Sequence, residues 1–91
     1  MEVKVSYNSY LIRKFTKIVS EKVFLKENSS IADLLGYLGS RYGEPFVEQM
    51  FDKNSGELKM LLLVNGVKAQ RLESMLSDSS RVNILSFTTG G

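Results

Sequence analysis

Residues 30–43, SIADLLGYLGSRYG, decide the fold, because they predict one amphipathic helix in the middle of a chain of strands. Ser30 and Asp33 predict a capping box, in which the hydroxyl accepts a hydrogen bond from the amide three residues on and the carboxylate reaches back. Gly43 predicts a left-handed cap at the other end. The apolar residues form one stripe, which should lie on a sheet: Ile31, Leu34, Leu35, Leu38 and Tyr42.

Two strands are expected before this helix. Polar and apolar residues alternate over residues 2–7 and again over residues 22–27, which is typical of half-buried strands. In the second of these strands, Val23 and Leu25 share one face. Residues 8–20 place apolar side chains at helical spacing over only a short stretch, so they predict a long connection with a helical turn.

The segments after the helix predict a hairpin. A proline opens residues 45–51, which form either a second short helix or a packed loop. Residues 58–64 are a nearly unbroken apolar run, typical of a strand at the centre of a sheet. Asn65-Gly66 then predicts a type I′ turn, since both residues tolerate positive φ, and residues 67–69 would be the returning strand.

The last strand is expected at residues 81–87, and the resulting order of elements has few unknotted arrangements. We expect an α+β fold of the β-grasp type: a mixed sheet of four to five strands with one main helix packed across one face. The first and last strands would lie side by side at its centre. This arrangement predicts a domain over residues 1–87 and a flexible C-terminal tail over residues 88–91.

Composition excludes most side-chain catalysis. The 91 residues contain no Cys, His or Trp, so disulfides, thiolate metal sites, Cys nucleophiles and Ser-His-Asp triads all lack a required part. The net charge is +2, and the basic residues are spread out rather than gathered in an arm, so nucleic acid is not an expected partner. No apolar run is long enough for a signal peptide or a membrane span, which makes a cytoplasmic protein the expectation.

The last four residues, Thr88-Thr89-Gly90-Gly91, follow the final strand directly. A pair of glycines at this place can be a frayed end. It can equally be a segment that threads through a narrow slot of a partner, because glycine has no Cβ to collide there. Thr88 and Thr89 are β-branched and favour the extended conformation that such threading needs.

Five short segments carry a resemblance that spans the chain: Val3-Lys4-Val5, residues 30–35, Leu63-Val64-Asn65-Gly66, residues 82–85 and the final Gly90-Gly91. Together they resemble the ubiquitin-like sulfur carriers, which include the small subunit of molybdopterin synthase, the thiamin sulfur carrier and the small archaeal modifier proteins. The chain departs from that family in having Ser79-Ser80 where Gly-Asp is common, and Phe87-Thr88-Thr89 where prolines are common in the molybdopterin type.

The resemblance implies a protein substrate rather than an enzyme. An E1-like activating enzyme would use ATP and magnesium to adenylate the Gly91 carboxylate, with Gly90 beside it, and this chain would bind no cofactor or metal itself. Sulfur would then give a thiocarboxylate for molybdopterin synthesis or tRNA thiolation, or a lysine of a target protein would form an isopeptide bond. Further partners would be a molybdopterin synthase large subunit or the modified proteins, and the free chain would be a monomer.

Strand alternation predicts where partners dock. If Val82 and Ile84 face the helix together with Leu61 and Leu63, the opposite face carries an exposed apolar group. The expected partner-binding residues are those of that face and of the tail: Met60, Leu62, Asn83, Leu85, Phe87, Thr88 and Thr89. Alternatively, the loops bury the apolar run on both sides. A non-covalent module, such as an RNA-binding β-grasp domain, is the competing function.

Overall fold

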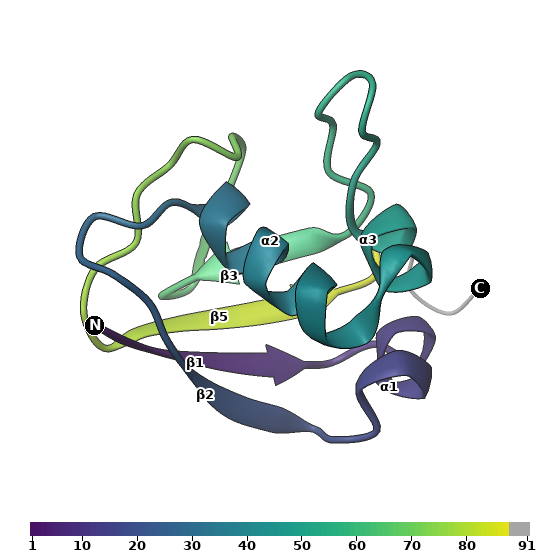
Figure 1. The fold of residues 1–91 in the computed structure, drawn as a ribbon, viewed down its shortest axis with the longest axis horizontal. Coiled ribbons are helices and arrows are strands. Elements are labelled where there is room, and N and C mark those ends of the chain that lie inside the picture. The colour runs from purple at the N-terminus through teal and green to yellow at the C-terminus, as the bar shows by residue number, and fades with distance from the viewer. Residues whose placement is uncertain (88–91) are drawn as a thin grey trace.

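The computed structural model describes residues 1–87, so the predicted tail at residues 88–91 lies outside the described residues. A mixed sheet of five strands has the order β2-β1-β5-β3-β4 (Figure 1). The strands are β1 (Glu2–Tyr7), β2 (Ser20–Phe24), β3 (Leu61–Val64), β4 (Val67–Lys68) and β5 (Ser80–Leu85). The helices are α1 (Tyr10–Thr16), α2 (Ile31–Tyr42) and α3 (Glu44–Met50). The predicted α+β architecture is confirmed.

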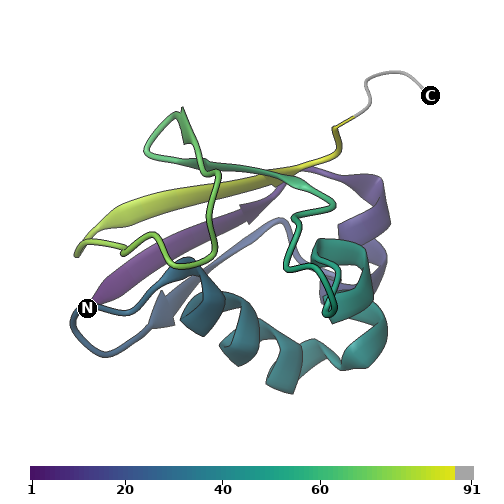
Figure 2. The ribbon, with the colours of Figure 1, turned by 90° about the horizontal axis from the view of Figure 1, so that it is seen from above.

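The first and last strands form the centre of the sheet. β1 and β5 run parallel, with Val5 opposite Val82, and the other strand pairs are antiparallel. The predicted position of these two strands, side by side at the centre of the sheet, is confirmed, and the structure adds that they run in the same direction. Figure 2 shows that α2 and α3 lie on one side of the sheet, whereas α1 follows the end of β1.

Helix α2 begins as its sequence predicts. The Ser30 amide donates to Asp33 Oδ2 at 2.8 Å, and the Asp33 amide donates to Ser30 Oγ at 3.2 Å, which completes the capping box. The other end differs from the prediction. Gly43 has φ 94° and ψ 174°, outside the left-handed helical region, because it forms a sharp bend that both ends α2 and begins α3.

The remaining local predictions hold with shifted boundaries. Asn65 and Gly66 have φ of 52° and 84°, as a type I′ turn requires. The helical turn expected within residues 8–20 is the seven-residue helix α1, and the segment 45–51, predicted as a short helix or a packed loop, largely coincides with the helix α3, Glu44–Met50, with Pro45 in its first turn. The strand predicted from residue 58 begins at Leu61 instead.

The Ser79-Ser80 pair forms the turn that enters β5. Ser79 adopts φ 66°, a conformation that glycine reaches at no steric cost, so a glycine suits this position better than serine. Its amide donates to the Glu2 carbonyl at 2.8 Å, which holds the turn against the start of β1. Ser80 is buried, and its hydroxyl donates to the Ser77 carbonyl at 2.7 Å.

The hydrophobic core lies between the sheet and helices α2 and α3 (Figure 2).

One carboxylate, that of Glu21, connects the sheet to the end of α2. Glu21 accepts hydrogen bonds from the Tyr7 hydroxyl at 2.6 Å, the Tyr42 hydroxyl at 2.5 Å and the Arg41 guanidinium at 2.8 Å. Burial, followed by the hydrogen bond to Glu21, raises the pKa of Tyr7 well above its ordinary value. Both tyrosines therefore stay neutral donors at neutral pH.

None of the helices within residues 1–87 has the length and hydropathy that a membrane crossing requires.

Candidate functional site: the open face of the sheet

The two apolar residues predicted to be exposed on β3 and just before it are buried instead. Leu62 has 0% and Met60 has 3% of its surface exposed. Leu62 lies opposite Ile84, which is also fully buried, so both side chains point toward the helices. The prediction that Met60 and Leu62 face a partner is therefore wrong. An apolar run shows no polar alternation, and only the pairing with β5 decides which of its residues point to the core.

The opposite face of β3 and β5 carries a group of apolar side chains, as predicted. Its members differ from the predicted ones. Leu61 lies opposite Leu85, and Leu63 lies opposite Asn83. All four residues are half-buried. The positions predicted for Asn83 and Leu85 are confirmed, whereas Leu61 and Leu63 were assigned to the wrong side. We call Leu61, Leu63 and Leu85 the leucine patch.

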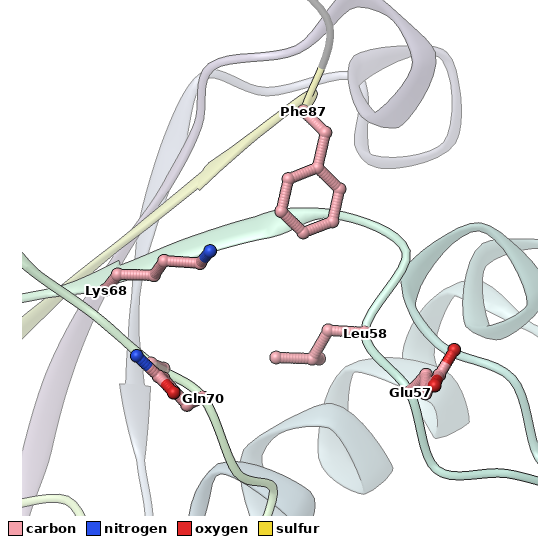
Figure 3. Close-up of a pocket in the computed structure, with 6 residues that line it drawn as sticks. Glu57, Leu58, Lys68, Gln70 and Phe87 are labelled. Atoms are coloured by element: carbon pink, nitrogen blue, oxygen red, sulfur yellow. The ribbon is translucent and has the colours of Figure 1, made fainter.

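Phe87 extends this apolar surface beyond the end of β5. Half of its surface is exposed, and Lys68 Nζ lies 5.7 Å from the centre of its ring. Figure 3 shows the ring pointing toward Leu58 and into a pocket that Glu57, Lys68 and Gln70 also line. The pocket has a volume of about 300 Å³ and is open to solvent. It is large enough for a partner's side chain next to the place where the described chain ends.

Hydrogen bonds anchor the end of β5 to the segment that enters α1. The Asn8 amide donates to the Ile84 carbonyl at 2.8 Å, and Asn8 Nδ2 donates to Asn83 Oδ1 at 2.6 Å. The hydroxyls of Ser9 and Ser86 lie 2.8 Å apart. These contacts hold the backbone of β5 in one direction up to Ser86.

The other predicted site residues lie outside the described part of the chain. They are Thr88, Thr89, Gly90 and Gly91. Within residues 1–87, no three His, Cys, Asp or Glu side chains are grouped as a metal site would require. What residues 1–87 provide is a five-stranded sheet with half-buried apolar side chains on its open face, beside the last strand.

A five-stranded mixed sheet with this strand order and a helix across one face defines the ubiquitin-like class of β-grasp proteins. The model of the ThiS family matches residues 5–91, which include Gly90 and Gly91. The chain therefore belongs to the ThiS family, within the ubiquitin-like sulfur carriers that its sequence resembles. No curated protein matches the chain.

Solved structures confirm the fold. SAMP1 from Haloferax volcanii has 18% sequence identity and a TM-score of 0.79, with 100% of both chains covered. A Pyrococcus furiosus protein provisionally described as a molybdopterin converting factor, subunit 1, has 24% identity and a TM-score of 0.77, covering 94% of this chain and 97% of that one. A chain of the BexX/CysO complex from Amycolatopsis orientalis has 22% identity and a TM-score of 0.76, covering 98% and 99%.

Proposed function

We propose that this chain is a carrier whose Gly91 carboxylate is activated by an E1-like enzyme with ATP and magnesium. The observation that carries the proposal is the ThiS family match through Gly90 and Gly91 on a β-grasp domain. An apolar face beside the last strand supports it, since such a face is available to a protein partner. Within this proposal the chain is a substrate, and ATP and magnesium are bound by the enzyme.

The chemistry needs no side chain of the carrier. A carboxylate oxygen of Gly91 attacks the α-phosphate of ATP, and pyrophosphate leaves. Hydrosulfide (HS⁻) supplied by a sulfur donor then attacks the acyl carbon, AMP leaves with the bonding electron pair, and the thioacid loses its proton. The product is a thiocarboxylate at Gly91, and this sulfur passes to an acceptor such as a molybdopterin precursor or a tRNA base. Gly90 allows the backbone to approach the nucleotide closely, because it lacks a Cβ.

Intact mass spectrometry tests the proposal. The purified chain is incubated with an E1-like enzyme, ATP, magnesium and a sulfur donor. We expect a mass increase equal to the exchange of one oxygen for sulfur, placed at Gly91 by fragmentation. A variant lacking Gly91 is the matched control, because it retains every described contact and ends in the Gly90 carboxylate, one residue short of the proposed point of activation. An adduct of equal yield on that variant would contradict the proposal.

We also propose that the same activated carboxylate can be transferred to lysine, because the fold also matches a small archaeal modifier protein of Haloferax volcanii over 91% of this chain. A lysine amine would attack the acyl carbon in place of sulfur and form an isopeptide bond. Lysines of cellular proteins that carry the C-terminal residues of this chain in isopeptide linkage, which after tryptic cleavage at Arg81 are residues 82–91, would establish this branch if these remnants are absent when the Gly91-deleted chain replaces the wild type. A complete lack of remnants together with thiocarboxylate formation would restrict the chain to sulfur transfer.

A further inference from the structure

Three basic side chains form a continuous row on the open face of the sheet, away from the leucine patch. Lys4 lies opposite Lys22 of the neighbouring strand β2 and opposite Arg81 of the neighbouring strand β5. Directly opposite residues in a sheet hold their Cβ atoms about 5 Å apart. All three side chains are exposed, and all three point away from the helices, because Val3, Val5, Val23 and Val82 point toward them.

This row lacks a carboxylate partner among the described residues. The ion pairs within residues 1–87 are Arg41 with Glu21 and Lys53 with Glu44, so neither involves the row. The three cations line an open pocket of about 350 Å³ together with Glu2, Ser79 and Ser80. Like charges directly opposite one another in a sheet destabilise it. Such a row therefore lowers the stability of the free chain, and an anionic partner would relieve the repulsion.

The position of the row indicates what kind of anion it meets. Along β5, Arg81, Asn83 and Leu85 point to the same face at intervals of about 7 Å. The cationic row and the leucine patch therefore belong to one surface, which reaches about 20 Å along β5 from Arg81 to Phe87. This length suits one side of a standard protein interface, which has an apolar centre and a charged rim.

We propose, building on the function proposed above, that Lys22, Lys4 and Arg81 bind a cluster of carboxylates on the E1-like activating enzyme while the leucine patch packs against its apolar surface. A protein partner is favoured over RNA, because the row shares its face of the sheet with the leucine patch, and an apolar surface suits a protein interface. The row acts on how fast the carrier meets the enzyme and on how it is oriented there. Its contribution therefore appears in the KM for the carrier and in the salt dependence of that KM.

A matched pair of double variants tests this assignment. K4E/R81E reverses two charges of the row, and K14E/R71E reverses one exposed lysine and one exposed arginine elsewhere. The assay measures ATP-dependent pyrophosphate release by the E1-like enzyme as a function of carrier concentration. For K4E/R81E we expect the KM for the carrier to rise at least about tenfold at low salt with kcat unchanged. The KM of the wild type should itself rise with salt, and K14E/R71E should behave as the wild type does.

The stability of the same variants separates recognition from damage to the fold. K4E/R81E exchanges the repulsion between positions 4 and 81 for an equal one between two carboxylates, but it turns the repulsion between positions 4 and 22 into an attraction, so its midpoint of thermal unfolding should be equal to or higher than that of the wild type. A variant that is more stable and yet activated less well has lost recognition and not structure. A lower midpoint in K4E/R81E than in K14E/R71E would contradict the description of the row as mutually repulsive.

Two further results would overturn the inference. One is an equal KM for both double variants and the wild type at low salt. The other is binding of single-stranded oligouridylate by the wild type that K4E/R81E loses while its activation kinetics stay unchanged, which would make the row an RNA surface. If the enzyme releases no pyrophosphate at all with the wild-type chain, this would instead contradict the proposed function. The assignment of a partner to the row would then be wrong as well.

Discussion

The two faces of the central strands carry similar apolar residues and differ in what covers them. On one face, Leu62 and Ile84 lie opposite each other and are fully buried beneath the helices. On the other face, Leu61 and Leu85 form the equivalent pair and are half-buried. In the short strand β3, Leu62 thus belongs to the core, whereas its neighbour Leu61 belongs to the proposed docking surface. The difference comes from the helices on one side and not from the residue type.

Leu62→Asp should have the largest effect on stability. It places a carboxylate in a fully buried position without a partner, and even Leu→Ala at such a site costs about 2–5 kcal/mol. A domain of this size has a free energy of unfolding of about 5–15 kcal/mol, so we expect the variant to lose its cooperative unfolding transition. Circular dichroism during thermal unfolding measures this. A folded Leu62→Asp variant would contradict the placement of Leu62 in the core.

Two glycines of α2 show the same contrast between a covered and an open side of one element. A Cβ on Gly39 would lie 2.6 Å from Val47 Cγ2 of α3, whereas a Cβ on Gly36 would have no atom within 4 Å. Gly39→Ala should therefore lower the free energy of unfolding by about 1–3 kcal/mol through overpacking. Gly36→Ala should raise it by about 0.5–1 kcal/mol through helix propensity. Denaturant unfolding of both variants checks the signs, and equal effects would mean that α2 and α3 are not in close contact.

The buried tyrosine at the end of β1, Tyr7, predicts a loss of stability in alkali. Because the pKa of Tyr7 is raised in the folded state, the unfolded chain releases this proton first, near its ordinary pKa of about 10. The stabilising contribution is complete below that pH and falls by up to about 1.4 kcal/mol per pH unit above it. In denaturant unfolding at pH 9 to 11, the free energy of unfolding of Tyr7→Phe should decline less steeply with pH than that of the wild type. Identical declines would show that the Tyr7 proton is not held by the fold.

Leu85→Asp should have the smallest effect on stability, although it makes the same chemical change as Leu62→Asp. Its side chain is half-buried on the open face, so we expect the unfolding transition to be retained with a change of about 0.5–1 kcal/mol. Activation by the E1-like enzyme should nevertheless fall strongly, because a carboxylate would enter an apolar contact. Loss of the folded state would assign Leu85 to the core, and normal activation would remove it from the docking surface.

The elements of the fold could be predicted because their signals are local. Ser30 and Asp33 cap α2 through contacts three residues apart, and Asn65-Gly66 forms its turn from two backbone conformations. The side of β3 that faces the core could not be predicted in this way. Residues 60–64 are apolar throughout, so both alternations are equally good until the pairing with β5 is known. The error on Met60 and Leu62 has this single cause.

The cationic row was also hidden in the sequence. Lys4 and Lys22 are separated by α1, and Arg81 follows them after most of the chain, so the basic residues look scattered. Parallel pairing of β1 with β5 and antiparallel pairing of β1 with β2 bring the three into adjacent positions. A count of charges along the chain cannot detect such a group, because the neighbours are made by hydrogen bonds between strands.

By itself, the sequence determined the order of the strands and the main helix α2, the absence of Cys and His, and the glycine pair at residues 90 and 91. Capping, turn formation and periodicity act over a few residues, so they can be detected without the fold. Only the tertiary structure decided which leucines form the core and which cations stand together, because burial and cross-strand proximity arise from pairings between segments that are distant in the chain.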